Sequence, residues 1–391
     1  MAKLGEICAF QSGGTPSKNK PEYFGGEIPW ISTTALNGGK INETDAVAWI
    51  TPKAIRESAA KIVPANSIMI GTRVGIGKVA INTVEMSTSQ DVISLTNIDE
   101  DKWYKPYLCK LLLSKKDYFN SQARGATIKG IKIDIVANID VPEIDYATQR
   151  KIAETLSKVD ELIAFRDQQL TKLDELIKAR FVEMFGDSVA NTKNFPSTTL
   201  ETVMTVFPQN GLYKPQTDYV QDNTGIPILR IDAFYNGKVT NWNTLKRLIC
   251  SETEINRYLL RENDIVINRV NSIEYLGKCA HIVGLKEKTV FESNMMRFHM
   301  DEKKVNAVYV TEVLCTEDIY RQILRRAKKS VNQASINQED VKSLEILVPP
   351  LSLQNQFAAF MERVDQQKQT VQQSLEKLEL MKNALMQEYF G

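Results

Sequence analysis

Residues 141–163, VPEIDYATQRKIAETLSKVDELI, decide the fold because a second segment, VPPLSLQNQFAAFMERVDQQ at 348–367, follows the same plan. In both segments proline ends a preceding strand and favours a turn, and a long run of helical periodicity follows. The likeness extends to the ends of the two runs, where FVEMFGD at 181–187 corresponds to LMQEYFG at 385–391. The chain therefore contains two long repeated units, and each finishes in the same kind of helix.

Each run has the apolar spacing of a coiled-coil helix, with steps that alternate between four and three residues. Neither proline nor glycine interrupts the first run between about 148 and 185. About 38 residues at 1.5 Å each form a rod of roughly 57 Å, which is too long for one small core. The seam residues are Ile152, Leu156, Val159, Ile163, Leu170, Leu173 and Ile177 in the first helix, and Phe357, Met361, Val364, Val371, Leu375, Leu378 and Leu385 in the second.

Charged residues interrupt both seams, at Arg166 and Arg180 in the first helix and at Lys368 and Lys382 in the second. Charges at such positions cost stability but can fix the register between helices. Chain connectivity requires helices that pair along their length to run antiparallel, which predicts a dumbbell with a pseudo-twofold axis. The alternative is two separate helices with exposed turns at these residues.

Weaker similarity continues upstream of both helices. IPWIS at 28–32 matches IPILR at 226–230, and MIGTRVGIGKVAI at 69–81 matches VINRVNSIEYLGKCAHI at 266–282. Short β-branched runs between Gly, Asn and Pro predict strands in each copy. The expected strands are 67–70, 78–81, 264–267 and 279–283, and the expected helices are 105–123 and 305–327.

The predicted fold class is therefore α+β. Two repeated, mixed and mostly β domains are separated by two long antiparallel helices that form a coiled coil. The expected boundaries are 1–145 for the first domain, 146–186 for the central helix, 187–347 for the second domain and 348–391 for the C-terminal helix.

Composition excludes several classes of protein. The net charge is +1, so any nucleic-acid site must be a concentrated surface on an otherwise balanced chain. The five cysteines are scattered and form no Cys-x-x-Cys pair, which disfavours disulfides and zinc. The start, MAKLGEICAF, does not resemble a signal peptide, and no apolar run is long enough for a membrane span. We expect a cytoplasmic protein.

A search for catalytic motifs favours a chain without chemistry of its own. GTRVGIGKV at 71–79 departs from a phosphate-binding loop, because Val79 replaces the hydroxyl residue that binds magnesium. Its glycines are better explained as a tight connection between strands. His281 and His299 have no neighbours at metal-ligand or nucleophile spacing, so both are expected to be strand residues. We expect neither a metal nor a cofactor.

Two recurring features suit DNA. Arg73 and Arg269 each follow a predicted strand, and the arginine fork suits guanine edges and phosphates. The densest basic stretches follow the predicted helices, ARGATIKGIK at 123–132 and RRAKKSVNQASI at 325–336. The polar loop GGTPSK at 13–18 and residues 30–34 are weaker candidates, and surface ion pairs or solvated faces remain the alternatives. The candidate DNA-binding residues are Thr72, Arg73, Lys78, Arg124, Thr127 and Lys129 in the first copy, and Arg269, Asn271, Lys278, Arg325, Arg326, Lys328, Lys329, Asn332 and Gln333 in the second.

Over essentially its whole length the chain resembles the specificity subunit of type I restriction-modification systems, and the two segments that start the helices carry the resemblance most specifically. The resemblance implies that each domain recognises one half of a split, asymmetric double-stranded DNA target and that the helices set the spacer. It also implies two methyltransferase subunits docked on the helices, which methylate adenine, and restriction subunits, a motor and nuclease, that join for cleavage. S-adenosylmethionine, ATP and magnesium would then belong to those partners.

Two other interpretations remain open. The chain could be a nucleic-acid-modifying enzyme with an unrecognised active site, or a structural coiled-coil adaptor.

Overall fold

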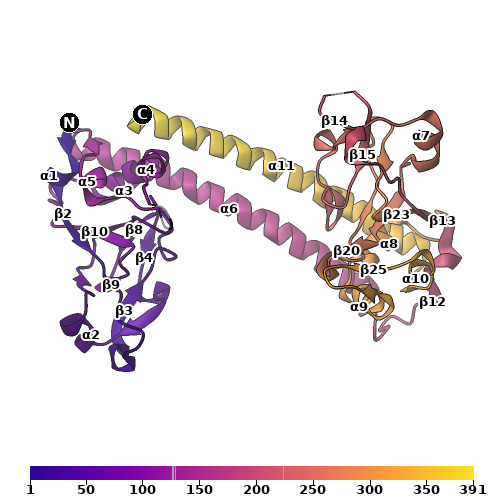
Figure 1. Ribbon diagram of the computed structural model, residues 1–391, viewed down its shortest axis with the longest axis horizontal. Coiled ribbons are helices and arrows are strands. Elements are labelled where there is room, and N and C mark those ends of the chain that lie inside the picture. Colours follow the sequence, from indigo (N-terminus) through magenta and orange to yellow (C-terminus); the bar gives the residue numbers. More distant parts are fainter. Residues whose placement is uncertain (126, 128, 223) are drawn as a thin grey trace. The chain divides into compact units, whose positions relative to one another are not determined.

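The computed structural model describes residues 1–125, 127, 129–222 and 224–391, and Figure 1 shows its helices and strands. The chain divides into two units. Unit 1 contains Met1–Gln168 and Val371–Gly391, and unit 2 contains Gln169–Thr370. Each unit therefore combines one mixed domain with half of each long helix. These helices, α6 (Tyr146–Phe185) and α11 (Leu351–Phe390), have 40 residues each.

The main sheet of unit 1 has five strands in the order β2-β10-β7-β8-β4. All neighbours are antiparallel except β4 and β8. A second sheet has the order β5-β3-β9-β6, and β1 pairs with β11. The strands are β1 (Ala2–Lys3), β2 (Ala9–Ser12), β3 (Phe24–Ile31), β4 (Lys40–Ile41), β5 (Ala48–Ile50), β6 (Ile62–Val63), β7 (Ile68–Gly71), β8 (Val79–Asn82), β9 (Met86–Thr88), β10 (Val92–Thr96) and β11 (Asp140–Val141).

Unit 2 repeats this topology. Its main sheet has the order β13-β23-β19-β21-β17-β16, its second sheet β14-β18-β15-β22, and β12 pairs with β26. The strands are β12 (Ser197–Thr199), β13 (Met204–Asn210), β14 (Tyr219–Val220), β15 (Ile226–Leu229), β16 (Phe234–Tyr235), β17 (Gly237–Val239), β18 (Arg247–Leu248), β19 (Asp264–Asn268), β21 (Cys279–His281), β22 (Val290–Phe291), β23 (Met295–Met300) and β26 (Glu345–Leu347). The predicted α+β class with two repeated mixed domains is confirmed.

The helices predicted at 105–123 and 305–327 are each two helices. In unit 2 the break falls at Thr316, whose hydroxyl accepts the Ile319 N–H and caps a new helix. In unit 1 Lys115 leaves the helical region, with φ −90° and ψ 10°. The helices are α1 (Leu4–Ile7), α2 (Pro52–Glu57), α3 (Lys105–Ser114), α4 (Lys116–Gln122) and α5 (Ile133–Ala137) in unit 1, and α7 (Glu252–Tyr258), α8 (Ala307–Leu314), α9 (Glu317–Arg326) and α10 (Gln338–Lys342) in unit 2.

The long helices run antiparallel within each unit, as predicted. In unit 1 Lys382 lies 2.7 Å from Asp160, and Arg166 Nε donates to Ser374 Oγ at 3.2 Å. Residue numbers thus fall along α11 as they rise along α6.

The same holds in unit 2. Lys368 lies 2.6 Å from Asp174, and the Arg180 guanidinium lies 6.0 Å from the centre of the Phe360 ring. The charged residues that interrupt the seams therefore contact the opposite helix, where they help to set its register.

Every predicted seam residue is buried or half-buried. Toward the domains the seam merges with the domain cores. In unit 1 Ile152 and Leu156 pack with Tyr107 and the main sheet, and in unit 2 Phe357 and Met361 pack with Tyr309. Each half-helix is thus anchored to its own domain by apolar burial. Among the described residues, no helix has both the length and the apolar character needed to cross a membrane.

Candidate nucleic-acid interface

In unit 1 a glycine-rich loop joins β7 to β8, as predicted for 71–79. The Gly71 N–H donates to the Lys78 carbonyl at 2.8 Å, and the Gly77 N–H donates to the Gly71 carbonyl at 3.0 Å. Gly77 has φ +75°, and a side chain there would approach the backbone of Lys116 to 3.2 Å. The tight turn leaves the side chains of Arg73 and Lys78 exposed.

The basic loop at 124–130 docks on this turn. Arg124 and Gly130 exchange backbone hydrogen bonds of 3.0 and 2.9 Å, and the Ile131 N–H donates to the Thr72 carbonyl at 2.8 Å. Two segments that are distant in the sequence, and that were both predicted to contact DNA, therefore meet. Residues 126 and 128 of this loop lie outside the described residues.

The glycine-rich loop, the basic loop and α4 border an open cavity of about 630 Å³, and four of its lining residues are basic. Among its described lining residues none is acidic. Lys116 and Asn120 are additions that sequence reasoning missed, although their spacing of four places them on one helix face next to the predicted basic loop. The lining residues are Arg73, Gly75, Ile76, Lys78, Lys116, Asn120, Ala123, Thr127 and Lys129.

Thr72 does not belong to this exposed surface. Its side chain is 4% exposed, and its hydroxyl donates to the Asp91 carbonyl at 3.1 Å. Asp91 also lies 3.8 Å from Arg73. Thr72 thus holds the loop in place, and its burial does not support the predicted DNA contact, while Arg73 remains about half exposed.

In unit 2 the equivalent basic loop forms a hairpin of β24 (Lys328–Lys329) and β25 (Ala334–Ser335), which pairs with β20 (Val270–Asn271). The Ser330 N–H donates to the Gln333 carbonyl at 2.7 Å and closes the turn. Arg325 lies just before the hairpin. The exposed predicted residues here are Arg325, Lys328, Lys329, Asn332 and Gln333.

Three other predicted residues in unit 2 are engaged within the protein. Arg326 donates to the carbonyl oxygens of Gln322 and Ser343 at 2.9 and 3.0 Å, which ends α9. Asn271 accepts the backbone N–H of Ser272 with its side-chain oxygen at 2.8 Å. The Arg326 guanidinium and the side-chain oxygen of Asn271 therefore take part in local structure.

Lys278 is the third. Its Nζ donates to the Ile231 carbonyl at 2.8 Å and lies 3.7 Å from the centre of the Tyr235 ring. Burial lowers the pKa of this ammonium group. A lysine held in this way is a poor phosphate contact, so the predicted role of Lys278 is not supported by its surroundings.

The backbone hydrogen bonds also correct the matching of the two copies. The Thr72 N–H donates to Asp91 O in unit 1, and the Arg269 N–H donates to Asn294 O in unit 2, both at 2.8 Å. Arg269 therefore occupies the position of Thr72, not that of Arg73. Sequence comparison missed this because the loop that follows is longer in unit 2.

The basic loops confirm this equivalence. The Ile336 N–H donates to Arg269 O at 2.9 Å, as the Ile131 N–H does to Thr72 O. In each unit the basic loop is thus hydrogen-bonded to the residue that follows the same strand of the main sheet, β7 in unit 1 and β19 in unit 2.

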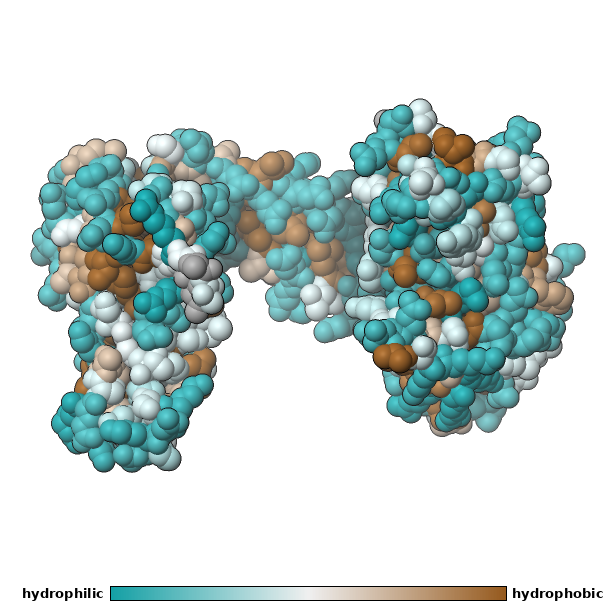
Figure 2. All heavy atoms as spheres, viewed as in Figure 1, coloured by the Kyte–Doolittle hydropathy of each residue, from teal (hydrophilic) through white to brown (hydrophobic). Residues whose placement is uncertain are grey.

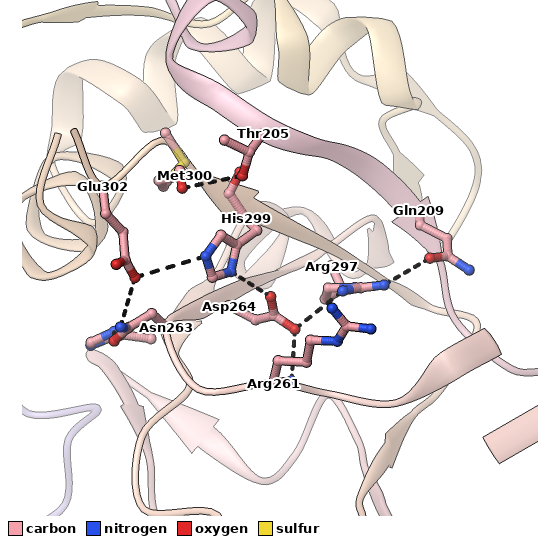
Figure 3. Close-up of polar contacts among 10 residues, drawn as sticks. Thr205, Gln209, Arg261, Asn263, Asp264, Arg297, His299, Met300 and Glu302 are labelled. Carbon is pink, nitrogen blue, oxygen red and sulfur yellow. Dashed lines mark hydrogen bonds and ion pairs between the residues drawn. The ribbon is translucent and has the colours of Figure 1, made fainter. Parts of the chain in front are cut away.

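A buried polar network lies at the other end of β19 (Figure 3). Asp264, fully buried at the start of this strand, accepts hydrogen bonds from His299 Nδ1 at 2.9 Å and from the Arg261 N–H at 2.8 Å. Arg297 pairs with the same carboxylate at 3.4 Å. The pairing balances a buried charge. Arg269 follows the opposite end of the strand, so the network is remote from the basic loop.

Both histidines lie in strands, as predicted: His299 in β23 and His281 in β21. Burial lowers the pKa of His281 to about 4, which keeps its ring neutral at physiological pH. Within the described ranges, no three His, Cys, Asp or Glu side chains are grouped to hold a metal ion.

Comparison with known proteins agrees with this architecture. The family model of the type I restriction modification DNA specificity domain matches residues 1–175 and 195–380. The chain is 23% identical over 414 residues to the type I restriction enzyme MjaIX specificity subunit of Methanocaldococcus jannaschii, covering 99% of this chain and 91% of the relative. It is 25% identical over 362 residues to the EcoKI specificity subunit of Escherichia coli K12, covering 87% and 75%.

The fold is similar to the crystal structure of the type I restriction-modification S subunit from M. genitalium. The TM-score is 0.59 at 14% identity, over 100% of this chain and 95% of that one. The family match covers most of the sequence and falls once on each unit's domain. The chain therefore belongs to the type I restriction modification DNA specificity family.

Proposed function

We propose that this chain is the DNA sequence-recognition subunit of a type I restriction-modification complex and has no catalytic chemistry of its own. Each recognition domain, 1–145 and 187–347, reads one half of a bipartite, asymmetric target. The observation that carries the proposal is the repeated fastening of a basic loop to one point of each main sheet, by Ile131 on Thr72 and by Ile336 on Arg269.

The asymmetry of the target follows from differences between the two basic loops. In unit 1 the exposed cations border a cavity with Arg73 and Lys129 on its wall. In unit 2 they stand on a two-stranded hairpin with Lys328 and Lys329. The same backbone frame thus presents different side chains, and different side chains select different base pairs.

We also infer that the helices at 146–186 and 348–391 are the spacer and the docking surface for two methyltransferase subunits. Motor-nuclease restriction subunits join them, and the complex directs adenine methylation or cleavage with S-adenosylmethionine, ATP and magnesium held by those partners. Exposed apolar side chains on the helices support a docking role, and Figure 2 shows hydrophobic residues among hydrophilic ones along them. They are Leu162, Phe165, Leu176, Val182, Leu380 and Met381.

The proposed location is the cytoplasm, where the partners and DNA are available. All five cysteines are free thiols, including Cys279 and Cys315, whose sulfur atoms are 3.6 Å apart in a hydrogen bond and not in a disulfide. Such a pair persists in a reducing compartment.

The test is to express the full chain with the methyltransferase subunit of its own system and to map methylated adenines across a genome. We expect one bipartite motif, with no methylation when either protein is omitted. The purified chain alone should neither methylate nor cut DNA. Turnover by the isolated chain would favour the enzyme alternative, and a chain that does not bind DNA would favour the adaptor.

A further inference from the structure

The two units share a second set of backbone hydrogen bonds beside the point where the basic loop is fastened. The Ser89 N–H donates to Ile31 O at 2.9 Å in unit 1, and the Glu292 N–H donates to Leu229 O at 3.0 Å in unit 2. These hydrogen bonds and the equivalence of Thr72 and Arg269 form a backbone frame that the two units share. The frame defines three matched positions. The matched pairs are Ser32 and Arg230, Thr72 and Arg269, and Ser89 and Glu292.

The side chains at the matched positions differ in chemical character between the two units. Unit 1 has a short hydroxyl side chain at each, whereas unit 2 has two guanidinium groups and a carboxylate. The backbone frame is retained while the side chains that it presents change from small and neutral to long and charged. Such a change is what two domains derived from one ancestor need in order to read different sequences.

In unit 2 the three side chains form a connected group. One carboxylate oxygen of Glu292 accepts the Ile231 N–H at 2.7 Å, and the other lies 3.9 Å from Arg230 Nε. The Arg230 guanidinium also lies 5.7 Å from the centre of the Tyr219 ring, and its Nη1 donates to the Tyr219 hydroxyl at 3.3 Å. Arg230 Nε also lies 3.8 Å from an oxygen of Asp232, so Arg230 is held by two carboxylates and a ring, with its side chain 26% exposed.

Arg269 lies alongside. Its Nη1 donates to the carbonyl of Ser293, the residue after Glu292, at 3.0 Å. Burial raises the pKa of Glu292, so its charge depends on the cations placed beside it.

Both units contain buried polar atoms without a hydrogen bond at these positions. In the described chain, the Nε atoms of Arg230 and Arg269 are buried without a hydrogen-bond partner, and so is Ser89 Oγ in unit 1. Buried polar atoms are normally satisfied, and those that are not call for a ligand or a bound water. Of these three atoms, Arg230 Nε lies 3.9 Å from a Glu292 oxygen and 3.8 Å from an Asp232 oxygen, whereas Arg269 Nε and Ser89 Oγ have neither a hydrogen bond nor an ion pair and could meet a polar ligand or water.

We propose that in unit 2 the side chains at these matched positions determine the DNA specificity, and that Arg230, oriented by Glu292, donates hydrogen bonds to a base edge in the major groove. Guanine fits best, because its O6 and N7 acceptors match a guanidinium fork. Glu292 is a positioning residue that acts through Arg230. This inference rests on the proposed function, since it assumes that unit 2 contacts a DNA half-site.

The experiment uses the full chain, purified with its methyltransferase subunit, and a library of DNA duplexes with randomised bases. Selection and sequencing give the preferred motif. For the wild type we expect two half-sites. Arg230→Ser, which installs the residue of unit 1, should lower the preference for guanine by about 10-fold at one or two positions of one half-site and leave the other half-site unchanged.

Two further variants test the same inference in case Arg230→Ser does not fold. Arg230→Lys keeps the charge but loses the fork, so it should relax the same positions. Glu292→Gln keeps an acceptor for the Ile231 N–H but removes the ion pair, so it should relax them too. The matched control is Arg247→Ser, because Arg247 also pairs with a glutamate of unit 2, Glu287, at 2.7 Å, but lies outside the frame. Its motif should equal that of the wild type.

An unchanged motif in Arg230→Ser, or a loss of affinity that is equal for all sequences, overturns the inference while the proposed function stands. A wild-type chain that selects no bipartite motif overturns the proposed function, and the inference falls with it.

Discussion

Gln149 and Gln354 make equivalent hydrogen bonds in the two units. The amide oxygen of Gln149 accepts the Tyr104 N–H at 2.9 Å, and that of Gln354 accepts the Asn306 N–H at 2.8 Å. Both side chains are almost fully buried, at 1% and 0% exposed. Each glutamine thus ties a long helix to the start of the helix that leads toward the basic loop.

Replacing either glutamine with leucine should destabilise its unit by about 1 to 3 kcal/mol, because the substitution leaves a buried N–H unpartnered. Urea unfolding of the full chain, followed by circular dichroism, measures the change. Gln168→Leu, an exposed position on α6, is the control for Gln149→Leu. Equal unfolding midpoints for these two variants would contradict the prediction.

Glu312 predicts a pH dependence of stability. Burial raises its pKa from 4.5 to about 6. The folded state therefore binds the proton of the Glu312 carboxyl more tightly than the unfolded state does. The contribution of Glu312 to the free energy of unfolding is present below pH 4.5 and is lost as the pH rises through about 6.

Glu312→Gln removes the charged form and should stabilise unit 2 by about 1 to 2 kcal/mol at pH 7.5, with no gain below about pH 4.5. Unfolding curves at both pH values measure the difference. Glu312 and the exposed residue Glu362 both line one cavity of unit 2, so the control is Glu362→Gln, which should change stability little at either pH. A gain that is independent of pH would show that the charge of Glu312 is not responsible.

Lys116 should act as a phosphate contact, because it lines the basic cavity of unit 1. Lys116→Gln should weaken DNA binding to a similar extent for every sequence and reduce the slope of log K against log salt by about 1. Fluorescence anisotropy with a labelled duplex at several salt concentrations measures both. Lys53→Gln, in the same unit and next to Glu22, serves as the control. A loss confined to one sequence would assign Lys116 to base recognition instead.

Helix length should set the gap between half-sites. One heptad added after Thr171 in α6 and another after Thr370 in α11 keep the seams in phase, and both fall between the Arg166–Ser374 and Asp174–Lys368 contacts. Each insertion adds about 10 Å, or about three base pairs along DNA.

Methylation mapping of the double insertion, with the partner present, should give unchanged half-sites and a longer gap. The single insertion in α6 is the comparison, because it strains one helix against the other and should reduce activity. An active double variant that keeps the original gap would show that the helices do not measure distance.

Most of the architecture could be predicted because its signals are local. The four- and three-residue steps from Ile152 to Ile177 define one face of a helix without reference to any other segment, and those side chains are buried or half-buried in the structure. The strands around Ile70 and Ile267 were placed correctly for the same reason. The break at Thr316 was missed because its capping hydroxyl competes with a helix pattern that continues past it.

By itself the sequence determined the repeat, the two long helices, the α+β class and the two basic loops. Only the tertiary structure decided which basic and polar side chains are exposed and which have partners within the chain. The side chains of Thr72, Arg326 and Lys278 donate hydrogen bonds to the backbone carbonyls of Asp91, Ser343 and Ile231, respectively.

Each of these partners comes from another segment of the chain. Tertiary packing likewise placed Lys116 on the cavity wall and Arg269 opposite Thr72 in the matched frames. The physical reason is that periodicity is a property of neighbouring residues, whereas burial and hydrogen-bond pairing depend on contacts between segments that only the folded chain brings together.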